Sequence, residues 1–224
     1  MNSLGTLYAK GQGVPQDYAK AREWYEKAAA KDNAGAMDNL GSLYANGDGV
    51  AQDYDKAREW YEKAAARGDA SAKKALEQLP ILEAATGGHY DEALRLEETV
   101  AAKVEAEETK RDGKPGAETA NALINVAWFA LFAKQFTTAL AAAERNHALF
   151  PDNLTIVPNR AHAHMFMEHN EEAKALYLAH KGEVFDQSGE LWERVIGQDF
   201  AEFRKAGLTH PMMADIEKEL GISR

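Results

Sequence analysis

Apolar and polar positions in residues 1–79 follow the period of an α-helix. The apolar residues of the opening segment have the i, i+3, i+4 spacing of one helical face: Leu4, Leu7 and Tyr8. Residues 11–13, Gly-Gln-Gly, interrupt this face, and glycine ends helices because it adopts a left-handed backbone without steric cost. A second apolar face follows, at Ala21, Trp24, Tyr25 and Ala28. Asp17 is placed to cap this second helix, so the pattern predicts a helix–turn–helix unit.

The same unit recurs 36 residues later. The string LGTLYAKGQGVPQDYAKAREWYEKAAA, which starts at Leu4, matches LGSLYANGDGVAQDYDKAREWYEKAAA, which starts at Leu40. A period between about 20 and 50 residues indicates a solenoid or a repeat array. Gly5 and Gly41 fall inside the first helix of each unit, where glycine costs about 1 kcal/mol relative to alanine. We therefore expect two helix backbones to approach closely at these glycines.

The shared string LGxLYxxGxGVxQDYxKAxxWYEKAA resembles the Sel1-like repeat, a helical-hairpin relative of the tetratricopeptide repeat, over residues 1–79. The resemblance implies a right-handed superhelix of antiparallel helix pairs that binds other proteins. Residues 34–39 precede Leu40, whereas residues 1–3 alone precede Leu4, so the first repeat is expected to be truncated. Because solenoids need polar capping ends, we expect self-association through this open N-terminal end.

From Pro80 onward the 36-residue signature fades while helical patterning continues. Three short segments resemble the turn and second-helix start of a tetratricopeptide repeat: residues 88–94, 135–140 and 169–173. We therefore expect three regions, namely Sel1-like repeats at 1–79, tetratricopeptide-like repeats at about 80–182 and a C-terminal helical cap at 183–224. Ser188 is placed to cap the first helix of the last region.

Together these patterns predict an all-α fold, a right-handed α-solenoid of antiparallel helix hairpins with C-terminal capping helices. We expect helices at residues 3–10, 17–31, 34–46, 53–67, 70–87, 90–111, 117–133, 136–149, 155–168, 171–180, 189–206 and 212–220. Pro80 is expected to split or kink the fifth of them. The residues expected in the core are Leu40, Leu43, Trp60, Tyr61, Ala64, Ala127, Phe129, Leu140 and Ala173.

Composition narrows the function classes. The 224 residues include 36 acids and 26 bases, a net charge of −10, so we expect no binding to nucleic acid or to an anionic membrane through bulk charge. The absence of cysteine excludes disulfides, thiolate metal sites and cysteine nucleophiles. The longest apolar run, 126–133, is far shorter than the roughly 20 residues of a membrane span. We expect a cytoplasmic protein, or a periplasmic one if an upstream signal precedes this chain.

The charge is unevenly distributed along the chain. Residues 1–79 hold 11 bases and 12 acids, a net charge of −1, whereas residues 80–224 hold 15 bases and 24 acids, a net charge of −9. A partner that binds the second half through electrostatics should therefore be basic.

No pattern in the chain points to catalysis. The seven histidines suggest metal binding, but His162 and His164 are two residues apart and face different sides of a helix, and no HExxH motif occurs. The GxGV turns lack the Lys-Ser/Thr pair of a phosphate-binding loop. We therefore predict no catalytic residue, no metal and no cofactor, and a protein that is not an enzyme.

The strongest candidate site lies on the first helices of the tetratricopeptide-like hairpins. Asn125 and Asn159 are 34 residues apart and so occupy equivalent positions. The resemblance implies that these first helices line a concave groove, where an asparagine hydrogen-bonds the backbone or terminal carboxylate of a bound peptide. The alternative is that both asparagines are structural. Trp128, His162 and Phe166 should lie on the same wall of the groove.

These observations predict a protein–protein interaction module or scaffold, part of a bacterial signalling or assembly protein, that binds a peptide or partner domain in its concave groove. The alternative is an enzyme or small-molecule binder with a pocket near the C-terminal helices, since a fold does not fix a function. A continuous groove with exposed aromatic residues would favour the first hypothesis. A closed cavity with converging polar groups would favour the second.

Overall fold

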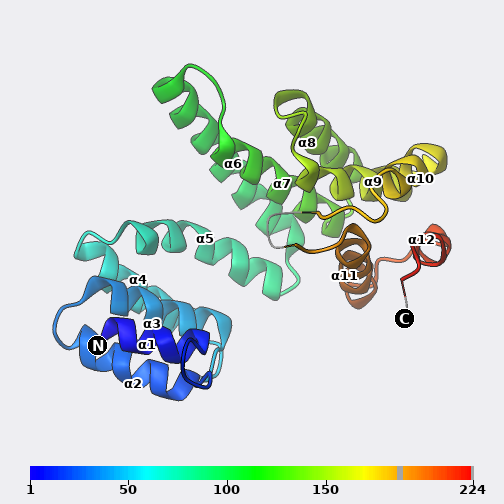
Figure 1. The fold of residues 1–224 in the computed structure, drawn as a ribbon. Helices are drawn as coiled ribbons and strands as arrows, with labels where there is room; N and C mark the ends of the chain where they lie inside the picture. The colour runs from blue at the N-terminus through cyan, green and yellow to red at the C-terminus, as the bar shows by residue number, and fades with distance from the viewer. Residues whose placement is uncertain (186–188, 223–224) are drawn as a thin grey trace. The chain divides into compact units, whose positions relative to one another are not determined.

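A computed structural model of the chain describes residues 1–185 and 189–222. Within these residues the fold is all-α, with twelve α-helices, one short 3-10 helix and no strand beyond an isolated bridge between Val184 and Leu191 (Figure 1). None of the helices in these two ranges has the length and apolar composition of a membrane span. The chain divides into two compact units, Met1–Gly87 and Gly88–Arg224.

The first unit is a run of five helices in which each helix packs against the next. They are α1 (Asn2–Lys10), α2 (Tyr18–Ala29), α3 (Ala34–Asn46), α4 (Tyr54–Ala66) and α5 (Ala70–Thr86). The second helix of each 36-residue repeat, α2 or α4, begins with the same side-chain cap. The carboxylate of Asp17 accepts a hydrogen bond of 3.0 Å from the amide of Lys20, and Asp53 accepts the same bond from Lys56. Side-chain caps of this kind satisfy amides that would otherwise have no partner at a helix start.

The two mid-helix glycines lie where helices touch, as the sequence predicts. A Cβ atom on Gly5 would lie 2.5 Å from the Cε1 atom of Tyr25, and one on Gly41 would lie 2.6 Å from the ring of Tyr61. Neither tyrosine ring could hold its position next to a larger residue. Each hairpin of the first unit therefore closes by packing a buried tyrosine ring onto a bare glycine backbone.

The second unit continues the pattern of sequentially packed helices through its first five α-helices. Its elements are α6 (Tyr90–Asp112), α7 (Ala117–Phe132), α8 (Phe136–Leu149), the 3-10 helix η1 (Leu154–Ile156), α9 (Val157–Phe166), α10 (Asn170–Ala179), α11 (Trp192–Lys205) and α12 (Met212–Leu220). One continuous hydrophobic core joins α6 through α12.

The predicted helices are confirmed, each within three residues of its expected bounds. Helix α5 is one helix from Ala70 to Thr86 with Pro80 inside it, so the expectation that Pro80 splits it is wrong. The expected boundary at residues 79 and 80 thus falls within α5, and the division into three regions stays a prediction. Ser188, the expected cap, lies outside the described residues.

The expected core is correct for six of its nine residues. Trp60, Phe129 and Leu140 are only half-buried, which corrects the expectation that they are core. Trp60 packs against the core of the first unit, and the ammonium group of Lys63 lies over its ring, 4.4 Å from the centroid. An aromatic ring that binds a lysine in this way lies at the edge of a core, where the lysine head stays in water.

Candidate functional site

The candidate site begins with a set of four rings on α7 and α9. Trp128 and Phe132 lie one turn apart on α7, and His162 and Phe166 lie one turn apart on α9. Each residue of α9 stands 34 positions after its counterpart on α7. The four rings surround the ring of Phe203 from α11, with centroid distances of 5.5, 5.2, 4.9 and 5.4 Å. We call these four residues the aromatic hole.

Helix α11 lies on the face that carries the aromatic hole. Four of its apolar residues recur at i, i+4, i+8 and i+11 and are buried: Trp192, Ile196, Phe200 and Phe203. The indole Nε1 of Trp192 donates a hydrogen bond of 2.7 Å to the carbonyl oxygen of Tyr177 on α10. Phe203 contacts two rings on α7, a helix that comes before the α9–α10 hairpin in the chain. Helix α11 therefore crosses the α7–α9 face, in addition to packing on the hairpin that precedes it.

A buried polar chain fixes α11 to α9. Nδ1 of His162 lies 2.7 Å from the hydroxyl oxygen of Tyr177, and Nε2 of His162 lies 3.0 Å from Oδ2 of Asp199 on α11. Burial raises the pKa of Tyr177 well above its usual value, and the nearby Asp199 carboxylate adds to this. Both ring nitrogens of His162 are therefore occupied, and the imidazole holds two helices together.

Beside α11 the same face remains open as a pocket of about 290 Å³, which we call the acceptor pocket. It is lined by Ile124, Asn125, Trp128, Thr155, Pro158, Asn159, Phe185, Val195 and Asp199. Three of the five predicted groove residues, Asn125, Trp128 and Asn159, meet here. His162 and Phe166 instead pack around Phe203 under α11.

The two predicted asparagines have different environments. Asn159 is buried, 4% exposed, and its amide nitrogen donates a hydrogen bond of 3.1 Å to the carbonyl oxygen of Ile124. Asn125 is exposed, and its amide nitrogen donates a bond of 3.0 Å to Oε1 of Glu97 on α6. Asn159 therefore ties α9 to α7, whereas the side-chain oxygen of Asn125 has no hydrogen-bond partner within residues 1–185 and 189–222.

The polar atoms around the acceptor pocket are mainly acceptors. The side chain of Asp199 is 18% exposed at the pocket, and only one of its oxygens is engaged by His162 in the described residues. Glu97, which binds Asn125, is buried, and its Oε2 has no hydrogen-bond partner in the part of the chain that the structure describes. Burial raises the pKa of Glu97, and the hydrogen bond from Asn125 opposes this shift. Such a site favours ligands that donate hydrogen bonds or carry positive charge.

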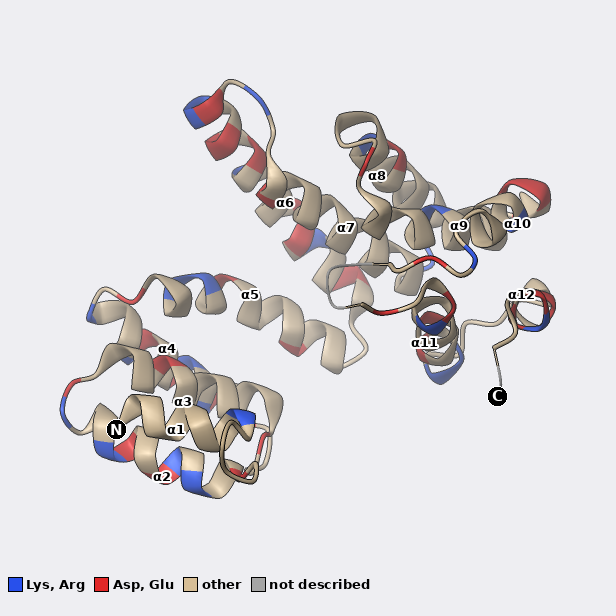
Figure 2. Cartoon of the chain, viewed as in Figure 1, with Lys and Arg blue, Asp and Glu red and all other residues tan. Residues whose placement is uncertain are grey.

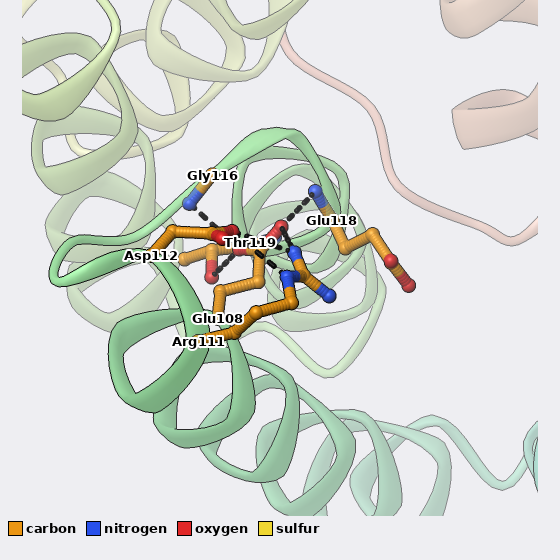
Figure 3. Close-up of polar contacts among 6 residues, drawn as sticks. All are labelled: Glu108, Arg111, Asp112, Gly116, Glu118 and Thr119. Carbon is orange, nitrogen blue, oxygen red and sulfur yellow. Dashed lines mark hydrogen bonds and ion pairs between the residues drawn. The ribbon is translucent and has the colours of Figure 1, made fainter.

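A carboxylate clamp sets the position of α7, which carries half of the site (Figure 3). Glu108 near the end of α6 accepts bonds from the backbone amides of Gly116, Glu118 and Thr119 and from the Thr119 hydroxyl, at 2.6–3.0 Å. Burial alone would raise the pKa of Glu108, but these four bonds lower it to about 2. The negative carboxylate of Glu108 binds the free amides at the N-terminus of α7, where a negative charge is favourable. It thereby fixes the α6–α7 turn.

The charge distribution agrees with the acidic second half seen in the sequence. Figure 2 shows acidic positions at intervals along α6. In the residues described, no three histidine, aspartate or glutamate side chains gather as a set that could bind a metal. A second hollow, of about 600 Å³, lies between α11 and α12 near the ion pair of Arg204 with Glu217. It stands where the alternative hypothesis places a small-molecule pocket.

Sequence reasoning missed Asp199, Tyr177 and Phe203 as parts of the site. The sequence marks Phe203 as part of the apolar face of a helix, but that pattern does not say which surface the face covers. Asp199 lies on this face by its spacing, three residues after Ile196 and four before Phe203, but the sequence does not show that a polar partner on another helix meets it there.

Comparison with known proteins gives a family for part of the chain. The family model of the Sel1 repeat matches residues 1–33 and 34–69, so the first unit is built on two Sel1 repeats. No curated protein sequence matches the chain.

Two solved structures resemble the chain at low identity. A Sel1 repeat protein from Oxalobacter formigenes is 22% identical over 98% of this chain and 84% of that one, with a TM-score of 0.49. The protein c5321, a protective antigen of uropathogenic Escherichia coli strains with an SLR fold, is 17% identical over 98% of this chain, with a TM-score of 0.41. This chain spans 59% of the length of c5321.

Proposed function

We propose that this chain, whose first unit contains two Sel1 repeats, is a protein-interaction module that binds a basic peptide segment in the acceptor pocket of its second unit. Sel1 repeats are generally scaffolds for protein–protein interaction. The proposal extends this general role to a particular surface, a particular ligand chemistry and a binding role without catalysis.

The observation that carries the proposal is the meeting of Asn125 and Asp199 at one pocket. The free side-chain oxygen of Asn125 accepts a backbone amide of an extended peptide. The carboxylate of Asp199 accepts a lysine or arginine side chain of the same peptide. The walls at Ile124, Trp128 and Val195 then bury the aliphatic stem of that side chain.

Burial of His162 supports binding over catalysis at this face. A general base needs a nitrogen within reach of a substrate proton, and both nitrogens of His162 already bind Tyr177 and Asp199. The imidazole is also fully buried beneath α11. The polar groups that converge here therefore hold the fold together and leave Asn125 and Asp199 to contact a ligand.

The test uses the full chain and labelled short peptides that carry a single lysine or arginine, with binding followed by fluorescence anisotropy. Asn125→Ala removes one hydrogen bond and should weaken binding about two- to tenfold. Asp199→Asn should weaken binding further and flatten its salt dependence. Asn121→Ala is the matched control, because Asn121 is an exposed asparagine one turn earlier on α7. Equal affinities for all four proteins would contradict the proposal.

A further inference from the structure

Helix α11 sits on the α7–α9 face in the manner of a bound ligand helix. Its single ring at Phe203 fills the aromatic hole, whose four members come from equivalent positions of two successive hairpins. One side chain inserted into a hole made by four residues of facing helices is the unit of specific helix packing. The face therefore has a built receptor for an aromatic residue on a helix.

The opposite side of α11 is polar, as it is in a helix that binds a groove with one face. Arg194, Gln198, Glu202 and Lys205 are exposed, whereas the four large residues of the inner face are buried. Recognition of an amphipathic helix through i, i+4 and i+7 or i+8 anchors is a common mode of peptide binding. Helix α11 has this pattern within its own fourteen residues.

The carboxylate of Asp199 both fixes α11 to His162 and lines the acceptor pocket. Oδ2 of Asp199 binds Nε2 of His162, and the same carboxylate lines the pocket. A lysine or arginine that enters the pocket pairs with this carboxylate and competes with His162 for it. Ligand binding in the pocket and docking of α11 are thus linked through Asp199.

From these three observations we infer that α11 is a resident occupant of a helix-binding groove, and that the groove's partner is an amphipathic helix with aromatic residues at i, i+8 and i+11. The partner replaces α11 and takes the aromatic hole for its own ring. The inference rests on the proposed function of this face, and it names the partner class and the segment with which that partner competes.

The experiment uses the full chain and a fluorescein-labelled synthetic peptide with the sequence of residues 190–206. Phe203→Ala in the protein weakens the resident helix and leaves the hole intact, so the peptide should bind this variant on the order of 100-fold more tightly than the wild-type chain. The same peptide with alanine at the position of Phe203 should lose this binding. Leu40→Ala, a buried site in the first unit, is the control for general destabilisation and should bind like the wild type.

Hydrogen exchange of the wild-type chain provides a second measurement that does not depend on the variant's folding. Amides of α11 should exchange faster than those of α7 and α9, because a displaceable helix opens without global unfolding. Equal protection of the three helices, or equal peptide binding by the wild-type and Phe203→Ala chains, would overturn the inference and make α11 a permanent part of the core. The lysine and arginine peptides test the pocket with α11 in place, so the proposed function can fail or survive separately.

Discussion

Nε2 of His162 on α9 lies 3.0 Å from Oδ2 of Asp199 on α11, and this contact is made inside a shell of aromatic rings. The contact joins the α7–α9 face to α11, the helix that covers this face. A partly buried polar contact of this kind contributes more to the specificity of docking than to its strength, because His162 loses its hydration completely. The register of α11 on the face therefore depends on Asp199, and the strength of its docking depends on the buried rings.

The ring of Phe203 should be the main source of that strength. Phe203→Ala should lower the free energy of unfolding of the second unit by about 3–5 kcal/mol, the usual result for a fully buried aromatic residue. Urea unfolding followed by tryptophan fluorescence measures it, with Trp24 and Trp60 of the first unit replaced by phenylalanine so that Trp128 and Trp192 alone report. Leu191→Ala is the control, because Leu191 directly precedes α11 and is exposed. Similar effects of the two substitutions would show that the aromatic hole does not hold α11.

The carboxylate of Glu108 should make the second unit sensitive to acid. Its pKa is about 2 in the folded chain and 4.5 in the reference state. Because the folded pKa is the lower one, the stabilisation is complete above pH 4.5 and is lost as the pH falls toward about 2. Glu108→Gln should cost about 1–3 kcal/mol at neutral pH and remove this component of the pH dependence. Unfolding curves between these pH values, with the exposed Glu107→Gln as control, test both parts.

The close approach at Gly41 should make alanine destabilising there, against the usual helix preference. Alanine gains about 1 kcal/mol over glycine inside a helix, but its methyl group would overlap the ring of Tyr61 at 2.6 Å. Overpacking of this kind costs about 1–3 kcal/mol, so the net effect of Gly41→Ala should be a loss of stability. In a double-mutant cycle, Tyr61→Leu should relieve most of this loss. A gain in melting temperature for Gly41→Ala alone would contradict the packing seen at Tyr61.

The sequence predicts the helices well because the signals for a helix, its apolar period and its capping residues, lie within the helix or next to it. It also predicts that Trp128, His162 and Phe166 belong to one face, and in the structure all three rings contact Phe203. It does not predict where α11 docks, because an apolar face of a helix is compatible with any apolar surface of the right size. The environments of Asn125 and Asn159 differ for the same reason: equivalent positions in a repeat have different neighbours once α6 and α11 are in place.

The half-buried Trp60 shows the limit of repeat periodicity. Its spacing is that of a core residue, yet the ring lies at the edge of the core beneath Lys63. Trp60→Ala should therefore cost about 1–2 kcal/mol, less than a fully buried tryptophan. Thermal unfolding measures the change, and Trp24→Ala should behave alike because Lys27 lies 4.7 Å from its ring centroid. A loss as large as that of a fully buried aromatic would place Trp60 in the core after all.

The apolar face of α1 should drive self-association of the chain. Met37, Leu40 and Leu43 on α3 are buried, at 4%, 0% and 4% exposure. Their counterparts 36 residues earlier are Met1 and Leu7, which are 52% and 39% exposed, and the half-buried Leu4. The same residue types therefore lie under a neighbouring helix in the second repeat and face solvent in the first.

The apolar surface of α1 is exposed, whereas the equivalent surface of α3 is buried. Such an exposed surface is expected to bind a similar surface on a second copy of the chain. The mean mass of the chain in sedimentation equilibrium should therefore rise with protein concentration, and Leu7→Glu should abolish the rise. Leu82→Glu is the matched control, because Leu82 is an equally exposed leucine, at 41%, on α5. A mass that stays at the monomer value across the concentration range, or a loss of association with Leu82→Glu alone, would show that α1 does not form the contact. Association that survives Leu7→Glu would likewise assign it to another surface, because a buried carboxylate without a partner costs more than such a contact supplies.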